Sequence, residues 1–550
     1  MRRDARKVAV GTGALLLAAV AVLLPQASVQ QRPLSDLFPA GPVLFLEARD
    51  FAGLVRDWNN SAVKRSWLAS GNYKVFSNSR LFLRLKEAQD QFAAAAGIAP
   101  DMTLVDAVSG GNSALALYDI GNLEFLYVTR MPQAKAYQSM LWQSRAKFQP
   151  RKSANVDYFV RQQQSRTAAF AVTGDLLLLA TSEQAMAGAL ALIGGQTVPA
   201  MRQEPWYQRA AAAQGAGELR MAINFQRTLN TPYYRSYWIH RNATEMAQFD
   251  AIVSDLDRSA AEFRERRVLL RAQPASDRRS GEGAVAEIGK AAPADAGLVR
   301  AWAKPDAQVV VAMLEQKLFT PRADAAQRET SAPAAGSMDA PLGSEDDLEV
   351  RIDEAPPVTE LSRADLSAVR SLIAANPVQA MMQVETSRPP ADGVFVTTAR
   401  AVALLGEHNW DAGAARTAVD GVTTQLWAVA GPPSTLGRVH VVAAGRLLVL
   451  SPADDLAAMI IGRSNAAASL PAAQYAMRFL HSTESPRYQR MTTLIDFPNR
   501  PTGDGAAHEP LFFSENIASL SRALSRLESA ALDSHDDGTA VRQNVVYRLR

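Results

Sequence analysis

The amino-acid sequence predicts an α+β protein: two related modules with mostly antiparallel sheets, hairpins and packed helices, plus one N-terminal transmembrane helix. Three observations lead to this prediction. The chain begins with a basic cluster and an uncharged apolar run. Its 550 residues are too many for one hydrophobic core. Short β-forming runs, joined by tight turns and followed by helical patterns, recur in the same order in both halves.

The start of the chain has the layout of a membrane signal. Residues 1–7 carry the basic cluster, and the apolar run 8–24 would extend for roughly 25 Å as a helix, close to the thickness of a hydrocarbon core. Signal-peptide cleavage after Ala27 would place Pro25 where a small residue is needed. We therefore expect residues 8–24 to remain as an anchor in the lipid bilayer, with a cleaved signal peptide as the alternative. Residues 1–7 would be cytoplasmic, and the bulk of this single-pass protein periplasmic or extracellular.

Charge and composition exclude several classes of function. The formal net charge of +3 comes from residues 1–7, so the remaining chain is neutral overall and offers no field that would attract nucleic acid. The chain contains no cysteine, which fits an oxidising compartment. This absence excludes disulfides, thiolate zinc sites, cysteine nucleophiles and lipid attachment through cysteine.

The two halves of the chain contain similar segments in the same order. The matched pairs are 38–48 with 292–302, 168–192 with 437–461, 217–225 with 472–480, and 251–272 with 526–550. This order predicts a tandem duplication, with a first module at 35–272, a linker at 273–283 and a second module at 284–550.

The best-matched pair is a hairpin followed by a helix. We expect its turns at Gly174-Asp175 and at Ala444-Gly445. The helix starts are predicted at Thr181, which has Gln184 three residues later, and at Ser451, which precedes a proline.

Several segments differ between the halves. A helical pattern covers 62–97 in the first half, whereas the second half has a shorter helix at 360–375 and an apolar run at 307–314 that predicts a strand. Residues 321–348 are rich in Ala, Pro, Ser and acidic residues and contain few large apolar ones, so we expect a disordered, protease-sensitive insertion there.

Three phrases carry a family resemblance: RLFLRLKEAQDQF, LALYDIGNLEFLYVTRMP and FAVTGDLLLLATSEQAMAGAL. They resemble an uncharacterised family of bacterial exported, membrane-anchored proteins that is known only as a domain of unknown function. The resemblance covers most of 35–272 and implies an anchored, extracytoplasmic α+β protein. It implies no catalytic or binding residue.

Motifs for metal and nucleophilic chemistry are weak. No two of the six histidines lie within one helical turn of each other, so the sequence predicts no metal site. Residues 533–538 are similar to a calcium loop but fit a hairpin turn better. The serine–lysine spacings 61–64 and 144–147 are typical of penicillin-binding proteins, but no partner motif accompanies them, and we interpret them as solvated helix positions. We therefore assign no catalytic residue, metal or cofactor.

Two clusters have both a functional and a structural interpretation. Tyr233, Tyr234, Tyr237 and Trp238 would stack in pairs at helical spacing, as a glycan or peptide contact or as an aromatic stripe packed on the sheet. We favour packing. The basic segment 264–271 would be an anionic-lipid patch or, as we favour, a solvated edge strand that blocks aggregation.

The leading hypothesis is a non-enzymatic envelope protein that binds or scaffolds an unknown envelope protein or glycan. The alternative is a hydrolase or transferase of envelope polymers whose site is not visible as a motif. A deep pocket lined by convergent acidic groups or histidines would favour the enzyme. A large exposed apolar patch would favour the binding protein.

Overall fold

The computed structural model describes residues 32–69, 102–163, 166–212, 217–231, 246–275, 280–319, 365–388, 397–430, 438–485 except 465 and 468, and 527–550, with scattered positions between 73 and 97. The expected anchor at 8–24, the aromatic residues 233–238 and the expected insertion at 321–348 lie outside this part. Within the described residues, no helix is long and apolar enough to cross a membrane.

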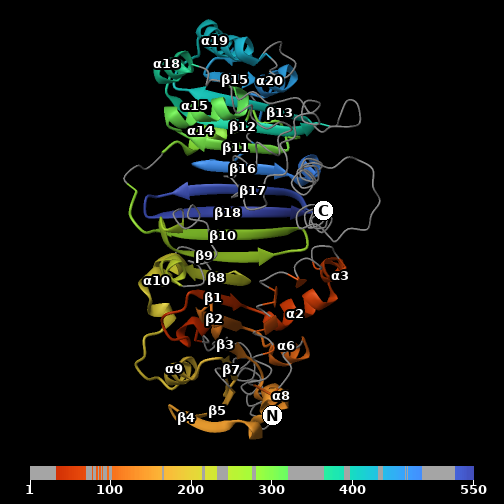
Figure 1. Ribbon diagram of the computed structural model, residues 1–550, viewed down its shortest axis with the longest axis vertical. Coiled ribbons are helices and arrows are strands. Elements are labelled where there is room, and N and C mark those ends of the chain that lie inside the picture. Colours follow the sequence, from red (N-terminus) through yellow and green to blue (C-terminus); the bar gives the residue numbers. More distant parts are fainter. Residues whose placement is uncertain are drawn as a thin grey trace, which may run out of the picture.

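The described strands form one antiparallel sheet of 18 strands, stacked along the longest axis of the molecule (Figure 1). This confirms the prediction of an α+β fold with antiparallel pairing, although one sheet runs through both halves. In spatial order, the first half contains β4 (Gln149–Ser153), β5 (Val156–Gln163), β6 (Arg166–Thr173), β7 (Leu176–Ala180), β3 (Glu124–Arg130), β2 (Ser113–Asp119), β1 (Leu44–Ala48), β8 (Leu219–Asn224), β9 (Phe249–Arg258) and β10 (Glu262–Arg271). The second half continues with β18 (Ala540–Leu549), β17 (Leu527–Asp536), β16 (Tyr475–Leu480), β11 (Leu298–Ala303), β12 (Val378–Arg388), β13 (Thr397–Gly406), β15 (Leu447–Ser451) and β14 (His440–Ala444).

The same pairings occur in both halves. Strand β1 lies between β2 and β8, and β11 lies between β12 and β16. The hairpins β6–β7 and β14–β15 add to β3 and β13, respectively. The last hairpin of each half, β9–β10 or β17–β18, follows β8 or β16, and β10 pairs with β18. The segments matched in the sequence therefore occupy equivalent places in the sheet.

Strand β10 lies in the middle of the sheet and not at an edge. It pairs with β9 through Phe263–Arg271 and with β18 through Glu262–Leu270. The expectation of an edge strand at 264–271 is therefore wrong. The charges do alternate between faces, but they form ion pairs within the sheet, such as Arg266 with Asp257 of β9 and Arg271 with Asp536 of β17.

Helices cover both faces of the sheet. One face carries α9 (Glu183–Ile193), α10 (Pro205–Ala212), α14 (Glu282–Gly289) and α20 (Asp454–Gly462). The opposite face carries α6 (Met102–Val108), α7 (Gln133–Gln138) and α8 (Met140–Gln143) at one end, and α15 (Ala307–Leu314), α18 (Ser367–Ala375) and α19 (Ala412–Ala430) at the other. The remaining described elements are α2 (Phe51–Asn60), α3 (Ala62–Leu68), α11 (Phe225–Asn230), η1 (Leu34–Asp36), η2 (Arg145–Lys147), η3 (Met201–Gln203) and the π-helical η4 (Glu315–Phe319).

The expected strand at 307–314 is the helix α15, so that prediction is wrong. The run of valines favours a strand by propensity. In the folded chain, however, Val310, Val311 and Leu314 lie on one buried helical face, while Val309 is 45% exposed. Packing against α18 in the surrounding core therefore decides the local structure.

The helix starts are each displaced from the prediction. Ser182, not Thr181, caps α9 by accepting a hydrogen bond from Ala185 N at 3.3 Å. The Thr181 hydroxyl instead accepts from Phe125 N and donates to Leu123 O, which ties the helix start to β3. In the second half, Ala453 is the N-cap of α20, and the Ser451 hydroxyl accepts from Ala453 N at 2.9 Å.

The turns agree more closely with the sequence. Gly174-Asp175 joins β6 to β7 as predicted, and Gly174 has a φ of 57°. The second turn is Gly445-Arg446, one residue later than expected.

Strand β4 is an edge strand that resists further pairing. Among the described residues it pairs only with β5, through a turn in which Ala154 and Asn155 have φ angles of 45° and 63°. Its residues are mostly exposed and include Pro150, which has no N–H to offer, and the cations Arg151 and Lys152. Proline and exposed charge on an edge oppose pairing with another chain.

Candidate functional site

The calcium-like segment is a hairpin turn, which confirms the structural interpretation. It joins β17 to β18, and Asp537 Oδ1 accepts hydrogen bonds from Thr539 N, Thr539 Oγ1 and Ala540 N. The hydrogen bond from the Thr539 side chain is the main reason why the pKa of Asp537 lies well below its ordinary value. Gly538 has a φ of 86°, as such a turn requires. No group of three metal-ligating side chains occurs in the described part of the chain.

The serine–lysine spacings belong to helix ends. Ser61 is the N-cap of α3, and its hydroxyl accepts from Lys64 N at 3.0 Å. The Lys64 ammonium donates to Asn59 Oδ1 at 2.6 Å, so the two side chains serve the local backbone and a neighbouring amide. Ser144 donates to Leu141 O at 3.0 Å at the end of α8.

Between the two groups of end helices, the described helices leave an apolar part of one sheet face only partly covered. We call it the central face. Cross-strand register places Leu115, Leu46 and Met221 in one row and Leu117, Leu44 and Ile223 in the next. All six side chains retain solvent exposure, and Leu46 is 37% exposed. On the far side of β10 and β18, Tyr475 and Trp302 of the same face lie with ring centroids 5.5 Å apart.

A polar group lies at the middle of the central face. Glu265 accepts two hydrogen bonds from the Arg267 guanidinium, at 2.7 and 2.6 Å, and one from Ser254 Oγ at 2.5 Å. Burial opposes ionisation of Glu265, but these hydrogen bonds outweigh it and lower its pKa. The central face therefore combines apolar flanks with a fixed ion pair.

The opposite face contains a buried ion pair. Arg220 of β8 donates to Asp255 of β9 through Nε and Nη2, at 2.7 and 2.8 Å. Asp255 is fully buried and also accepts from Gly217 N at 3.2 Å. Beside them, burial raises the pKa of Glu47, although the Arg220 charge opposes this shift.

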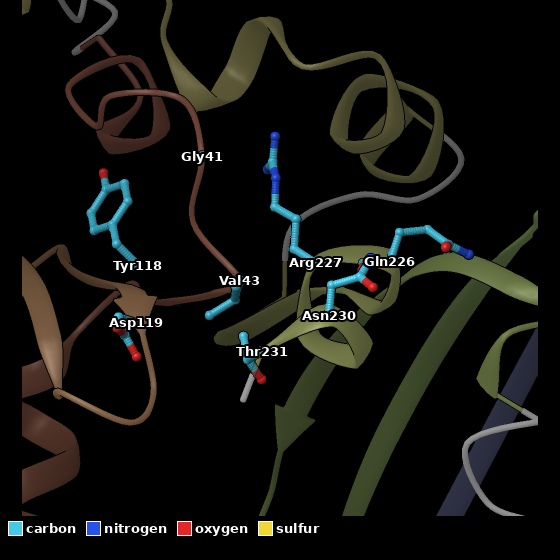
Figure 2. A pocket seen from close by; sticks show the side chains of 8 residues that line it. All are labelled: Gly41, Val43, Tyr118, Asp119, Gln226, Arg227, Asn230 and Thr231. Carbon is cyan, nitrogen blue, oxygen red and sulfur yellow. The ribbon is translucent and has the colours of Figure 1, made fainter. Parts of the chain in front are cut away.

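A cleft of about 500 Å³ opens where β1 and β2 meet α11, and we call it the α11 cleft. Figure 2 shows its walls: Tyr118 and Asp119 come from the end of β2, and four side chains come from α11 and the residue after it, with the segment Gly41–Val43 between them in this view. The α11 residues are Gln226, Arg227, Asn230 and Thr231.

The guanidinium of Arg227 is held by a buried carboxylate. Its Nη1 donates to Glu204 Oε2 at 2.6 Å and to Pro42 O at 3.3 Å. Glu204 is 7% exposed and also accepts from Gly41 N at 2.6 Å and from Trp206 Nε1. These bonds fix the orientation of Arg227 at the wall of the cleft.

Two further residues of the cleft are fixed by backbone contacts. The Tyr118 hydroxyl donates to Pro39 O at 3.0 Å. Burial, reinforced by the nearby charges of Glu204 and Glu124, raises the pKa of Tyr118, so the phenol stays protonated at neutral pH. Asp119 Oδ1 accepts from Gly121 N at 2.7 Å and from Asn122 N at 3.2 Å, which holds the carboxylate at the end of β2.

No motif in the sequence indicated the α11 cleft. Its residues come from three segments that are far apart in the chain, and no pair of them has a spacing typical of a known site. The four aromatic residues singled out in the sequence, Tyr233, Tyr234, Tyr237 and Trp238, lie outside the described residues. Their functional and packing interpretations both remain predictions.

Comparisons with known proteins supply no evidence about the function of this chain. No family model and no curated protein matches the chain. Among solved structures, the chain is similar to crystal forms I and III of TP0453, at 12% identity to each. Form I covers 45% of this chain and 82% of its own, form III covers 46% and 84%, and both give a TM-score of 0.24. A likeness at this score carries no inference about fold or function.

Proposed function

We propose that the chain is an extracytoplasmic envelope protein that is anchored by residues 8–24 and binds or scaffolds another envelope protein or a glycan, without catalysing a reaction. The basic start and the apolar run support the anchor. The equivalent strand pairings support two related modules, at 35–272 and 284–550, that arose by tandem duplication.

The observation that carries the binding role is the central face. Monomeric soluble proteins rarely expose contiguous apolar patches larger than about a few hundred Å², and larger patches usually mark contacts with other molecules. Here the partly exposed leucines of β1 and β2 continue into Met221 and Ile223 of β8. The fixed pair Glu265–Arg267 beside them would give such a contact polar specificity.

Position-specific crosslinking tests this role. A photo-crosslinking residue at Leu46, on the central face, should give a discrete crosslinked product in intact cells. The matched control is Met459, which is 40% exposed but lies on α20, against the opposite face of the sheet. The proposal fails if position 46 gives no product or if both positions give the same products.

A charge on the central face provides a second test. Leu46→Glu should abolish the product formed from a crosslinker at Met221, because a buried unpaired carboxylate is strongly unfavourable in an apolar contact. The exposure of Leu46 means that the thermal unfolding midpoint should change little. Loss of the product together with unfolding would not support the proposal. Leu46→Ala is the control, because it keeps the face apolar and should retain the product.

A further inference from the structure

The sheet of the second half ends in a strand whose outer edge is not protected. Among the described residues, β14 pairs only with β15. Its residues, His440 to Ala444, include no proline, lysine, arginine or carboxylate. The edge strand β4 at the other end of the sheet has a proline and two cations, which oppose pairing. An apolar edge without such residues is a template for a further strand.

The first half shows how the equivalent edge is covered. The hairpins β6–β7 and β14–β15 correspond, with Gly174 and Gly445 at the same position of the two turns. Val441 of β14 therefore corresponds to Phe170 of β6. Strand β5 pairs with β6 there, and Phe159 lies opposite Phe170. The same edge thus accepts an antiparallel strand in the related module.

The second half uses the corresponding part of its chain for a helix. In the first half, β4 and β5 lie between β3 and β6 in the sequence. In the second half, the described element between β13 and β14 is α19. Val419 and Val422 of α19 are buried in the core on one face of the sheet. A strand that covers β14 therefore does not come from the part of the chain that forms β5 in the first half.

The helix beside β14 also has an uncovered flank. Tyr158 of β5 donates to Glu183 Oε1, at the start of α9, at 3.0 Å. Asp454 is the equivalent first residue of α20, and its side chain is 77% exposed, against 36% for Glu183. Ala458 of α20 is exposed, whereas its counterpart Ala187 is partly buried and accepts a hydrogen bond from β4. The surface that β4 and β5 cover in the first half is therefore open in the second.

Strand β14 itself has the side chains that this place requires. Residues 158–160 of β5 are Tyr, Phe and Val, a polar ring followed by two apolar side chains. Residues 440–442 of β14 are His, Val and Val, which have the same order of properties. A second β14, running antiparallel to the first, would therefore present a polar ring and two apolar side chains where β5 presents them.

We infer that β14 pairs with β14 of a second copy of this chain, so that the sheet continues across a two-fold axis at Val441. Val441 then lies opposite Val441 of the second copy, and His440 lies opposite Val442. His440 of the second copy takes the place of Tyr158, on the side of the sheet where Asp454 is exposed. This dimer contact is separate from the binding role of the central face.

Cysteine pairing tests both the dimer and its register, because the natural chain has no cysteine. Full-length His440→Cys and Val442→Cys proteins with different tags are mixed in detergent and oxidised. Residues directly opposite each other have Cα atoms about 4.5–5.5 Å apart, which permits a disulfide. Two copies of the same variant would place their cysteines diagonally, about 7–8 Å apart, which is too far.

The mixture should therefore give at least about fivefold more disulfide-linked dimer than either variant alone. A single strand pair is a small contact, so the yield should rise with protein concentration. The absence of a linked dimer, or equal yields from the mixture and the single variants, would overturn the inference. A strand from another source on this edge would give the same negative result.

Three variants serve as controls. Arg151→Cys, on the protected edge β4, should give no linked dimer. Leu46→Glu, on the central face, should leave the yield of the mixture unchanged when it is added to both proteins. Val442→Lys places a charge on β14, as Lys152 does on β4, and should weaken dimerisation at least about tenfold in analytical ultracentrifugation.

Thermal unfolding shows whether the Val442→Lys protein is folded. If it is folded and dimerises as strongly as the wild type, the inference is overturned. If it does not fold, the cysteine pairs decide, since these substitutions add no charge to the edge.

Discussion

Replacing Arg220 by methionine should destabilise the protein strongly and in a pH-dependent way. Methionine keeps much of the packing volume but leaves Asp255 fully buried without its cationic partner. The isolated carboxylate then avoids a buried charge by taking up a proton. Protonating an aspartate costs about 4 kcal/mol at pH 7 and about 1.5 kcal/mol at pH 5. The reason is that each pH unit above the ordinary pKa of an aspartate adds about 1.4 kcal/mol.

Urea unfolding of the full chain in detergent, followed by tryptophan fluorescence at both pH values, measures this loss. The control is Arg258→Met, whose partner Glu218 is about as exposed as Arg258 itself, so its loss should stay below about 1 kcal/mol at either pH. Adding Asp255→Asn to Arg220→Met should recover part of the stability, since the amide oxygen still accepts from Gly217 N. A loss below about 1 kcal/mol at pH 7, or an equal loss at pH 7 and pH 5, would refute the reasoning.

Three further outcomes are expected. Burial raises the pKa of Glu47 in the folded state above its ordinary value of 4.5. Ionisation of Glu47 at higher pH therefore lowers the stability of the folded state. Glu47→Gln should unfold at a higher urea concentration than the wild type at pH 8, but not at pH 4. Asp537→Ala removes the acceptor of the β17–β18 turn and should cost about 1–2 kcal/mol in the same assay, whereas Asp537→Asn should cost less. Sequencing the N-terminus of the membrane-bound protein should find residues 8–24 still attached, and a start near Ser28 in a soluble fraction would contradict the anchor.

Local patterns in the sequence were sufficient for the hairpins. The turn at Gly174-Asp175 needs a residue with a positive φ between two apolar runs, and this requirement is visible in a few neighbouring residues. The pairing of β10 with β18 could not be predicted from the sequence, because it joins residues more than 250 positions apart. Without that pairing, a strand as rich in arginine as β10 is most simply interpreted as an edge.

The helix α15 and the α11 cleft were missed for related reasons. The valines of α15 have strand propensity, and only the surrounding core determines that they form a helix. The orientation of Arg227 beside the cleft depends on a contact with Glu204, and the two residues lie far apart in the chain without a characteristic spacing. Both features arise from tertiary packing, and a single sequence contains little information about it.

The position of β18 also constrains the order in which the molecule is completed. Strand β18 follows every other described strand along the chain, yet it lies between β10 and β17 at the centre of the sheet. During synthesis, β10 therefore has one unpaired edge until residues 540–549 emerge. A chaperone that shields this edge during synthesis would protect the first half from aggregation while the second half is still being made.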